Sequence, residues 1–291
     1  MASLADEPRS AGWTVGKRLS MRWRGATGPA RTLPDFLVIG AARAGSTSLF
    51  AILTAHPQVL PPSHKELHFF DRNYPRGLAH YRRMFPLESH RRLVTRRLGR
   101  PVLTGEATTY YLFHPAVPER VARELPDVRL VAILRDPVDR AYSHYQLSVR
   151  NGHEPLSFED ALDAEDGRLA GEEERLAADP AYRSPAHAFN SYVSRGLYLP
   201  QLERWHRHVA RERLLVLRSE DLFERPTDAV EEVTSFLDLA PHPGPLPAPR
   251  NRAEYGGMSD ATRERLRRRF EEPNRRLEAY LGRELRWQRP A

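Results

Sequence analysis

The chain has 291 residues, of which 40% are hydrophobic and 29% charged, enough apolar material for a folded core, so a wholly disordered chain is excluded. No stretch reaches the length of about 18 uncharged apolar residues that a transmembrane helix needs, and no apolar signal region opens the chain. Cysteine is absent, which excludes disulfides, a thiol nucleophile and thiolate metal sites. We therefore expect a cytoplasmic protein with no integral membrane segment.

The positive charge is concentrated near the N-terminus. The formal net charge is +7, and residues 1–33 hold six basic and two acidic residues. This stretch combines Gly, Pro and Arg without hydrophobic periodicity, so we expect a flexible basic leader over 1–33 and a single domain over 34–291. The domain shows no cluster of basic and aromatic residues, and we expect no nucleic-acid partner. Lysine occurs only at positions 17 and 65, beside 43 arginines.

Short apolar runs alternate with helical patterns along the domain. This alternation is typical of an α/β fold with a central parallel sheet flanked by helices. In chain order, the sequence predicts a strand at 36–40, a helix at 46–53, a strand at 102–106, a helix at 119–125, a strand at 129–134, a helix at 138–150, a strand at 214–217 and a helix at 229–239.

Two charged regions are also expected to be helical. Residues 151–185 are acidic and rich in alanine, and we expect helical elements there that border a cleft rather than a separate domain. Residues 260–281 predict a final helical region that is interrupted near Pro273, because proline lacks the backbone N–H that a helix interior needs.

A glycine-rich turn, Gly40-Ala-Ala-Arg-Ala-Gly45-Ser46-Thr47, joins the first predicted strand to the first helix. Such a turn directs backbone N–H groups and the positive end of a helix to one point, which suits a phosphate. Ser46 stands where a Walker A loop has lysine, and the cation Arg43 lies inside the loop instead. We favour phosphate binding of the P-loop nucleotide-binding type over an ordinary strand-to-helix turn.

The strongest predicted strand, at 129–134, is followed by Arg135-Asp136-Pro. An arginine at the carboxyl end of a parallel strand faces the ligand crevice and can form paired hydrogen bonds with a phosphate. A P-loop ATPase would place a magnesium-binding carboxylate here, so the arginine argues against ordinary NTP hydrolysis. We interpret Asp136 as the N-cap of the following helix, in which Ser143 lies two turns from the start.

Two other segments supply acid–base groups. Lys65-Glu-Leu-His-Phe-Phe-Asp71 places a base, an imidazole and a carboxylate within seven residues, next to aromatic side chains. Thr104-Gly-Glu-Ala-Thr-Thr-Tyr-Tyr111 leaves a predicted strand with hydroxyls and a carboxylate. Taken alone, the first segment fits a pair of core phenylalanines with surface charges as well as it fits a catalytic site.

In combination, these motifs resemble the PAPS-dependent sulfotransferases, particularly the branch related to heparan sulfate sulfotransferases and their bacterial relatives; PAPS is 3′-phosphoadenosine 5′-phosphosulfate. The resemblance covers about residues 34–287. IGAARAGSTSL (39–49) is similar to the 5′-phosphosulfate loop of the family, KELHFFD (65–71) to its catalytic segment, and LVAILRDPVDRAYSHY (130–145) to its 3′-phosphate motif.

The resemblance implies a set of site residues. Glu66 is the implied general base, His68 and Asp71 are neighbouring site residues, and Arg43 stands where the family usually has a catalytic lysine. Ala107 replaces another family lysine, so an expected contact with an acidic glycan is missing. The residues implied to bind the nucleotide are Arg43, Ala44, Gly45, Ser46, Thr47 and Ser48 at the 5′-phosphosulfate, Arg135 and Ser143 at the 3′-phosphate, and Arg252 and Tyr255 in a late loop.

The resulting hypothesis is in-line transfer of a sulfuryl group from PAPS to a hydroxyl or amine, with PAP as the second product and no metal required. The acceptor is left open among glycans, lipids and small natural products, and so is the oligomeric state. Two alternatives remain at this point. One is a P-loop nucleotide kinase, and the other is a non-catalytic nucleotide-binding relative.

Overall fold

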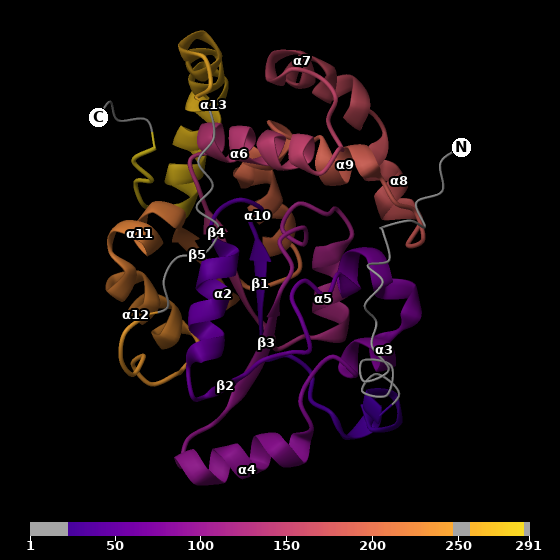
Figure 1. Cartoon of the computed structure of the whole chain (residues 1–291), viewed down its shortest axis with the longest axis vertical. Helices are drawn as coiled ribbons and strands as arrows, with labels where there is room; N and C mark the ends of the chain where they lie inside the picture. Colours follow the sequence, from indigo (N-terminus) through magenta and orange to yellow (C-terminus); the bar gives the residue numbers. More distant parts are fainter. Residues whose placement is uncertain (1–22, 247–256, 288–291) are drawn as a thin grey trace.

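Five parallel strands form the centre of the part of the chain that the structure describes (Figure 1). This is a computed structural model, described over residues 23–246 and 257–287. The strands lie in the order β2-β3-β1-β4-β5, so β1 is central. The predicted α/β class with a parallel central sheet is confirmed. The strands are β1 (Phe36–Gly40), β2 (Val59–Leu60), β3 (Leu103–Ala107), β4 (Arg129–Leu134) and β5 (Leu214–Arg218).

Helices cover the faces of the sheet and lie above its carboxyl edge. The helices are α2 (Ser46–Ala55), α3 (Leu78–Arg82), α4 (Glu88–Leu98), α5 (Val117–Glu124), α6 (Pro137–Arg150), α7 (Phe158–Leu169), α8 (Glu172–Ala178), α9 (Pro185–Phe189), α10 (Tyr198–His206), α11 (Ser219–Glu224), α12 (Pro226–Phe236) and α13 (Asp260–Leu281). Shorter helical turns are η1 (Gly28–Ala30), η2 (Phe69–Asn73), η3 (Tyr74–Arg76), η4 (Ser194–Gly196) and η5 (Arg211–Arg213).

The helices predicted after the four strands correspond to α2, α5, α6 and α12, with ends displaced by at most three residues. β2, α3 and α4 were not predicted. β2 has only two residues, too few for an alternating pattern to show. α4 buries none of its residues and therefore lacks the apolar stripe from which a helix is predicted.

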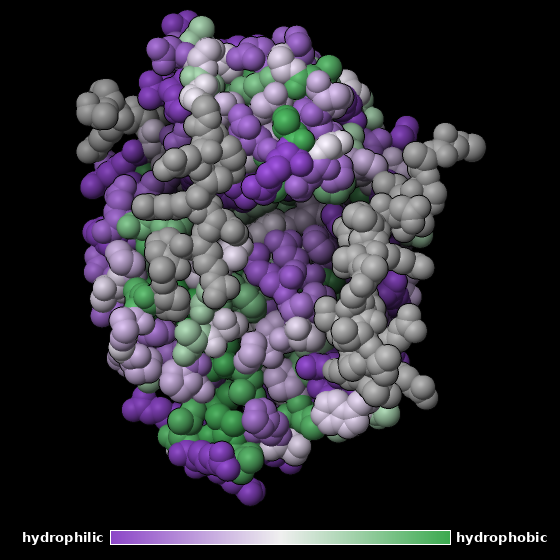
Figure 2. Space-filling model, viewed as in Figure 1, coloured by the Kyte–Doolittle hydropathy of each residue, from purple (hydrophilic) through white to green (hydrophobic). Residues whose placement is uncertain are grey.

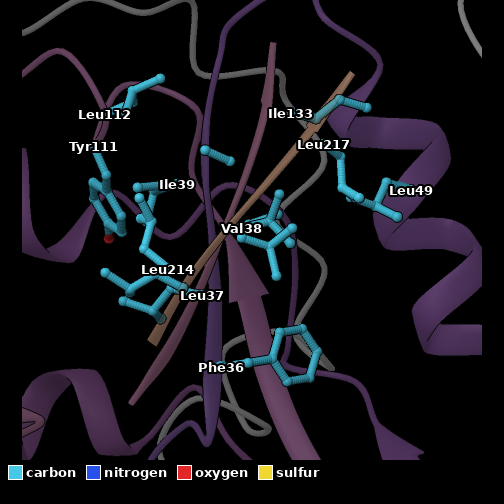
Figure 3. Close-up of a cluster of buried hydrophobic side chains, with 14 of the residues drawn as sticks. Phe36, Leu37, Val38, Ile39, Leu49, Tyr111, Leu112, Ile133, Leu214 and Leu217 are labelled. Atoms are coloured by element: carbon cyan, nitrogen blue, oxygen red, sulfur yellow. The ribbon is translucent and has the colours of Figure 1, made fainter. Parts of the chain in front are cut away.

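The central strand is apolar on both of its faces. Residues 36–39 are completely buried. Because successive side chains of a strand point to opposite faces, Val38 lies on the side of Leu49 from α2, whereas Ile39 lies on the side of Tyr111 (Figure 3). This two-sided burial is typical of parallel sheets and explains why the sequence of β1 is a continuous apolar run.

A second hydrophobic cluster joins α6, α7 and α13 near the carboxyl edge of the sheet (Figure 1). The cluster buries Phe158 of α7, Phe270 of α13 and Tyr192, which lies between α9 and η4. The acidic stretch at 151–185 contains α7 and α8 and ends at the first residue of α9. Its predicted helical character is therefore confirmed.

The predicted interruption near Pro273 is wrong, since α13 is continuous through it. Leu266 and Phe270, before the proline, are buried in the cluster with α6, and Leu277, after it, is buried in the main core. Packing on both sides of Pro273 holds the helix together although one backbone hydrogen bond is lost.

Residues 23–33, which the sequence places in the leader, contact the domain. Arg31 is buried and donates from Nη1 to the carbonyl of Phe85 at 2.7 Å, and it forms a β-bridge with Leu87. Its guanidinium lies 4.6 Å from the ring centroid of Trp23. The packed part of the chain therefore begins before residue 34, and residues 1–22 lie outside the described residues.

Within residues 23–246 and 257–287, no helix combines the length and apolar character needed to cross a membrane.

Candidate functional site

The carboxyl ends of β3, β1 and β4 lie side by side, because these parallel strands are neighbours in the sheet. Ligands of open α/β sheets bind in the crevice outside such ends. Where these strands end in Figure 1, the space-filling view is hollowed, and hydrophilic residues line the hollow (Figure 2). The segments that follow Gly40, Ala107 and Leu134 therefore meet at one place.

The β1–α2 turn presents the start of α2 to this crevice. Arg43 and Gly45 both have left-handed backbones, with φ of 70° and 96°. A Cβ at Gly45 would lie 3.0 Å from the ring of Phe223, so this position requires glycine for space as well as for conformation. No side chain caps the N-terminus of α2, and its first turn contains no acidic residue. The turn is thus suited to bind an anion.

Two of the residues implied for the 3′-phosphate are brought to this turn. Arg43 donates from Nε to Ser143 Oγ of α6 at 3.0 Å, and Arg135 donates from Nη1 to the carbonyl of Arg43 at 3.3 Å. The carbonyl of Arg135 accepts from the hydroxyl of Tyr198 at 2.9 Å, which fixes the backbone after β4. Asp136 accepts from the N–H of Val138 and caps α6, as predicted.

Glu66 lies next to the segment that follows β3. Its Oε2 accepts from the N–H of Thr109 at 3.1 Å, and its Oε1 accepts from the Thr109 hydroxyl at 3.0 Å. The side chain is 23% exposed, so the carboxylate is fixed in orientation and remains accessible. This combination is what a general base for an incoming substrate needs.

Lys65 is a candidate site residue to which the sequence analysis gave no role of its own. Its Nζ lies 3.2 Å from Oγ1 of Thr47, in the first turn of α2, and 3.2 Å from Oε1 of Glu66. The ammonium therefore bridges the candidate base and the first turn of α2. One signal in the sequence pointed to it: Lys65 is one of two lysines beside 43 arginines.

His68 lies between two carboxylates. Its Nδ1 is 2.7 Å from Oδ2 of the buried Asp71, and its Nε2 is 3.5 Å from Oε2 of Glu66. Burial disfavours the imidazolium, but the charge and hydrogen bond of Asp71 outweigh this and raise the pKa of His68. Burial likewise opposes ionisation of Asp71, yet the pKa of Asp71 is lowered by His68 and Arg72. The pair fixes the imidazole beside Glu66.

The remaining implied residues divide into three groups. Ala44, Ser46, Thr47 and Ser48 lie in or directly after the β1–α2 turn, as expected. Ala107, at the end of β3, is buried and presents no charge to the crevice. Arg252 and Tyr255 lie outside the described residues.

Comparison with known proteins finds sulfotransferases among both the family models and the curated relatives. A protein-family model described as "Sulfotransferase domain" matches residues 33–267. The chain is 26% identical over 322 residues to the membrane-associated sulfotransferase kil1 of Dictyostelium discoideum, covering 88% of this chain and 67% of that protein. It is 31% identical over 217 residues to the human bifunctional heparan sulfate N-deacetylase/N-sulfotransferase 3, covering 72% of this chain and 23% of that protein. The chain thus spans between 23% and 67% of the length of these two relatives.

Among solved structures, a sulfotransferase from Alicyclobacillus acidocaldarius is 30% identical to the chain and superposes with a TM-score of 0.64. The match covers 89% of this chain and 100% of that one. The fold is therefore the P-loop-containing α/β fold of these enzymes, and the predicted family is confirmed. Since the family match extends over most of its length, the chain belongs to the sulfotransferase family.

Proposed function

We propose that the protein transfers a sulfuryl group from PAPS to a hydroxyl or amine of an acceptor. The observation that carries this proposal is the meeting of an uncapped helix start, three cations and a fixed carboxylate at one edge of the sheet. The cations are Arg43, Arg135 and Lys65, and the carboxylate is Glu66. Cations and helix N–H groups suit the negative charges of a phosphosulfate, and the carboxylate suits removal of a proton.

The residues present fit a doubly phosphorylated nucleotide. The N–H groups at the start of α2 offer donors to a 5′-phosphosulfate. Arg135 and Ser143, on either side of Arg43, offer donors to a 3′-phosphate. When bound, PAPS supplies the sulfuryl group, which passes from a phosphate oxygen to the acceptor.

Glu66 is the proposed general base. Thr109 holds both of its oxygens, so the carboxylate needs no rearrangement to accept the proton of the acceptor. Removing that proton as the bond to sulfur forms makes the hydroxyl or amine a stronger nucleophile. His68, fixed by Asp71, lies beside Glu66, with its Nε2 3.5 Å from Oε2 of the carboxylate.

Lys65 is proposed to stabilise the charge that develops on the leaving phosphate. The resemblance implies Arg43 for this task, but Nε of Arg43 is bonded to Ser143, on the 3′-phosphate side. Nζ of Lys65 donates instead to Thr47, in the first turn of α2 where the 5′-phosphosulfate is proposed to bind, and also lies 3.2 Å from Oε1 of Glu66. A compact ammonium held there can approach the oxygen on which negative charge develops more closely than a planar guanidinium can.

The acceptor is proposed only as a chemical class, a small molecule or glycan with a free hydroxyl or amine. The human relative is named for N-sulfotransfer to heparan sulfate, which makes a glycan amine one candidate. The uncharged, buried Ala107 favours an acceptor less acidic than heparan sulfate.

A cytoplasmic location stays a prediction, which cell fractionation tests.

A nucleotide kinase is not favoured, because Ser46 replaces the Walker A lysine and Arg135 replaces the magnesium carboxylate after β4. Calorimetric titration separates the two functions. PAP is expected to bind in EDTA and to stabilise the fold by about 2.7 kcal/mol at a concentration of 100 times its Kd. Tighter binding of Mg-ATP than of PAP would contradict the proposal.

The catalytic role of Glu66 has its own test, with labelled PAPS and a panel of hydroxyl and amine acceptors. Glu66→Gln is expected to lower turnover by about 10²–10⁴-fold, because the amide cannot accept the proton. Its affinity for PAP is expected to stay unchanged, since Glu66 serves the acceptor. An active Glu66→Gln beside an inactive, folded His68→Asn would move the role of base to His68.

A further inference from the structure

A completely buried carboxylate, Glu106 of β3, lies behind the Lys65–Asp71 segment and belongs to no role described so far. Three hydroxyl groups converge on it. The Thr108 hydroxyl donates to Oε2 at 2.7 Å, and the hydroxyls of Tyr81 and Tyr111 donate to Oε1 at 2.8 and 2.9 Å. A carboxylate that accepts three hydroxyl protons in the core orients those three hydroxyls.

Two of the hydroxyls also bind the backbone of the catalytic segment. Thr108 Oγ1 accepts from the N–H groups of Leu67 and His68, at 3.1 and 3.3 Å. The hydroxyl oxygen of Tyr111 accepts from the next two N–H groups, those of Phe69 at 2.9 Å and Phe70 at 3.3 Å. Four consecutive N–H groups are thus satisfied by two side chains that both donate to one carboxylate.

The direction of these hydrogen bonds follows from proton counting. A hydroxyl has one proton, and both Thr108 and Tyr111 give theirs to Glu106, so their lone pairs face the four N–H groups. We propose that Glu106, as a carboxylate, is a positioning residue that holds Glu66 and His68 in place through Thr108 and Tyr111. The inference rests on the proposed function, because Glu66 and His68 are the groups that it positions.

The segment needs such support because its backbone is irregular. His68 has a left-handed backbone with φ of 50°, which is unfavourable for a residue with a side chain. Its Phe69 and Phe70 neighbours are buried, so their N–H groups have no access to water. Without oriented acceptors, buried donors would be unpaired directly beside the candidate base.

The arrangement makes the site sensitive to pH near neutrality. The titratable groups that face Glu106 are Tyr81 from α3, Tyr111 after β3, and Asp71 from η2. Burial raises the pKa of Glu106 to about 7, although the hydroxyl hydrogen bonds lower it. Below that pH, the protonated carboxyl must donate a proton itself, and one hydroxyl loses its acceptor. Turnover is therefore expected to fall as the pH drops through this range.

Tyr81 and Tyr111 provide a matched pair for the test. Both rings are completely buried and both hydroxyls donate to Oε1 of Glu106, but only Tyr111 accepts from the catalytic segment. Tyr111→Phe is expected to lower kcat at pH 8.5 by about tenfold or more, because small misplacements of catalytic groups are costly. Tyr81→Phe is expected to leave that kcat within about twofold, since the segment keeps its acceptors.

Two further measurements exclude a merely structural effect. Tyr81→Phe removes a donor to the carboxylate, so the acid limb of its kcat–pH profile is expected to move to higher pH. In hydrogen–deuterium exchange, the amides of residues 67–70 are expected to exchange faster in Tyr111→Phe and unchanged in Tyr81→Phe. Thr108→Val repeats the comparison for Leu67 and His68 if Tyr111→Phe folds poorly.

Equal kcat values and equal exchange in the two tyrosine variants would overturn the inference. An acid limb that does not move in Tyr81→Phe would show that Glu106 is not the group that titrates and would overturn the pH dependence. If the wild-type chain transfers nothing from PAPS, the proposed function fails, while the exchange measurement still tests the positioning by Glu106.

Discussion

At the scale of single residues, the structure places two cations, Arg43 and Lys65, at different parts of the candidate site. Arg43 lies within the β1–α2 turn but bonds to Ser143 of α6, whereas Lys65 comes from a different segment and bonds to Thr47. A guanidinium presents several donors in a fixed plane, and an ammonium presents a compact charge. The two side chains therefore suit different parts of one ligand, and their substitutions are expected to affect different kinetic constants.

Lys65→Met is expected to lower kcat by about 10²–10³-fold, the cost of losing one donor to a developing charge, with little change in PAP affinity. Arg43→Met is expected to weaken PAP binding by about 1.5–3 kcal/mol, the range for a hydrogen bond to a charged group. Turnover with labelled PAPS and calorimetric titration with PAP check the two effects. The reverse pattern, with kcat lost in Arg43→Met alone, would return the catalytic charge to Arg43.

At the scale of elements, the β1–α2 turn is determined by backbone conformation as much as by its side chains. Gly45 is left-handed and ends the turn directly before α2, with the ring of Phe223 against the space that a Cβ would fill. The N–H groups at the start of α2 are aimed by this residue, because a different φ would redirect the first helical turn. Binding of an anion at this turn is therefore expected to depend on a residue that has no side chain.

Gly45→Ala is expected to weaken PAP binding at least about tenfold and to destabilise the fold by more than the roughly 1 kcal/mol of a left-handed alanine alone. Gly99→Ala is the matched control: Gly99 is also left-handed, with φ of 64°, but a Cβ there would meet nothing within 4 Å beyond its chain neighbours. Titration with PAP and urea unfolding of both variants check this. Equal losses in stability, with PAP affinity retained, would show that the turn tolerates a Cβ.

At the scale of the whole molecule, the N-terminal segment and the far end of the chain both join the core. Residues 23–33 pack against the region before α4, where Arg24 and Arg31 donate to backbone carbonyls of residues 83–85. α13, near the other end of the chain, spans the hydrophobic cluster of α6 and the main core. Residues near both ends of the sequence therefore contribute to global stability.

Deleting residues 1–22 is expected to leave the Tm and PAP binding unchanged, because this stretch offers little periodic apolar surface to bury. Deleting residues 1–33 is expected to lower the Tm, since it removes the buried Arg31 and its hydrogen bond to the carbonyl of Phe85. Scanning calorimetry of the two truncated chains, with Arg31→Ala as a point control, checks this. A large loss of Tm on removal of 1–22 would show that Trp13 or its neighbours pack on the domain.

The order and type of the main elements could be predicted because their signals are local. An apolar run of five or six residues followed by a helical pattern identifies β1 and β4 without reference to the rest of the chain. The signal of the β1–α2 turn was equally local, since glycine and a helix start lie within one short stretch. Pro273 misled the prediction because helix packing on both of its sides, which lies outside any local window, outweighs a lost hydrogen bond.

The sequence by itself therefore determined the α/β class and the family, and it predicted the β1–α2 turn as a phosphate site and Glu66 as the base. Only the tertiary structure decided which hydroxyl each cation meets: Arg43 bonds to Ser143, 100 residues away, and Lys65 bonds to Thr47, 18 residues away. It also revealed that Glu106 lies behind the segment of residues 65–71, at a separation of about 40 residues. Such contacts depend on strand order and on the crossing of loops at one sheet edge, and no pattern of neighbouring residues encodes either.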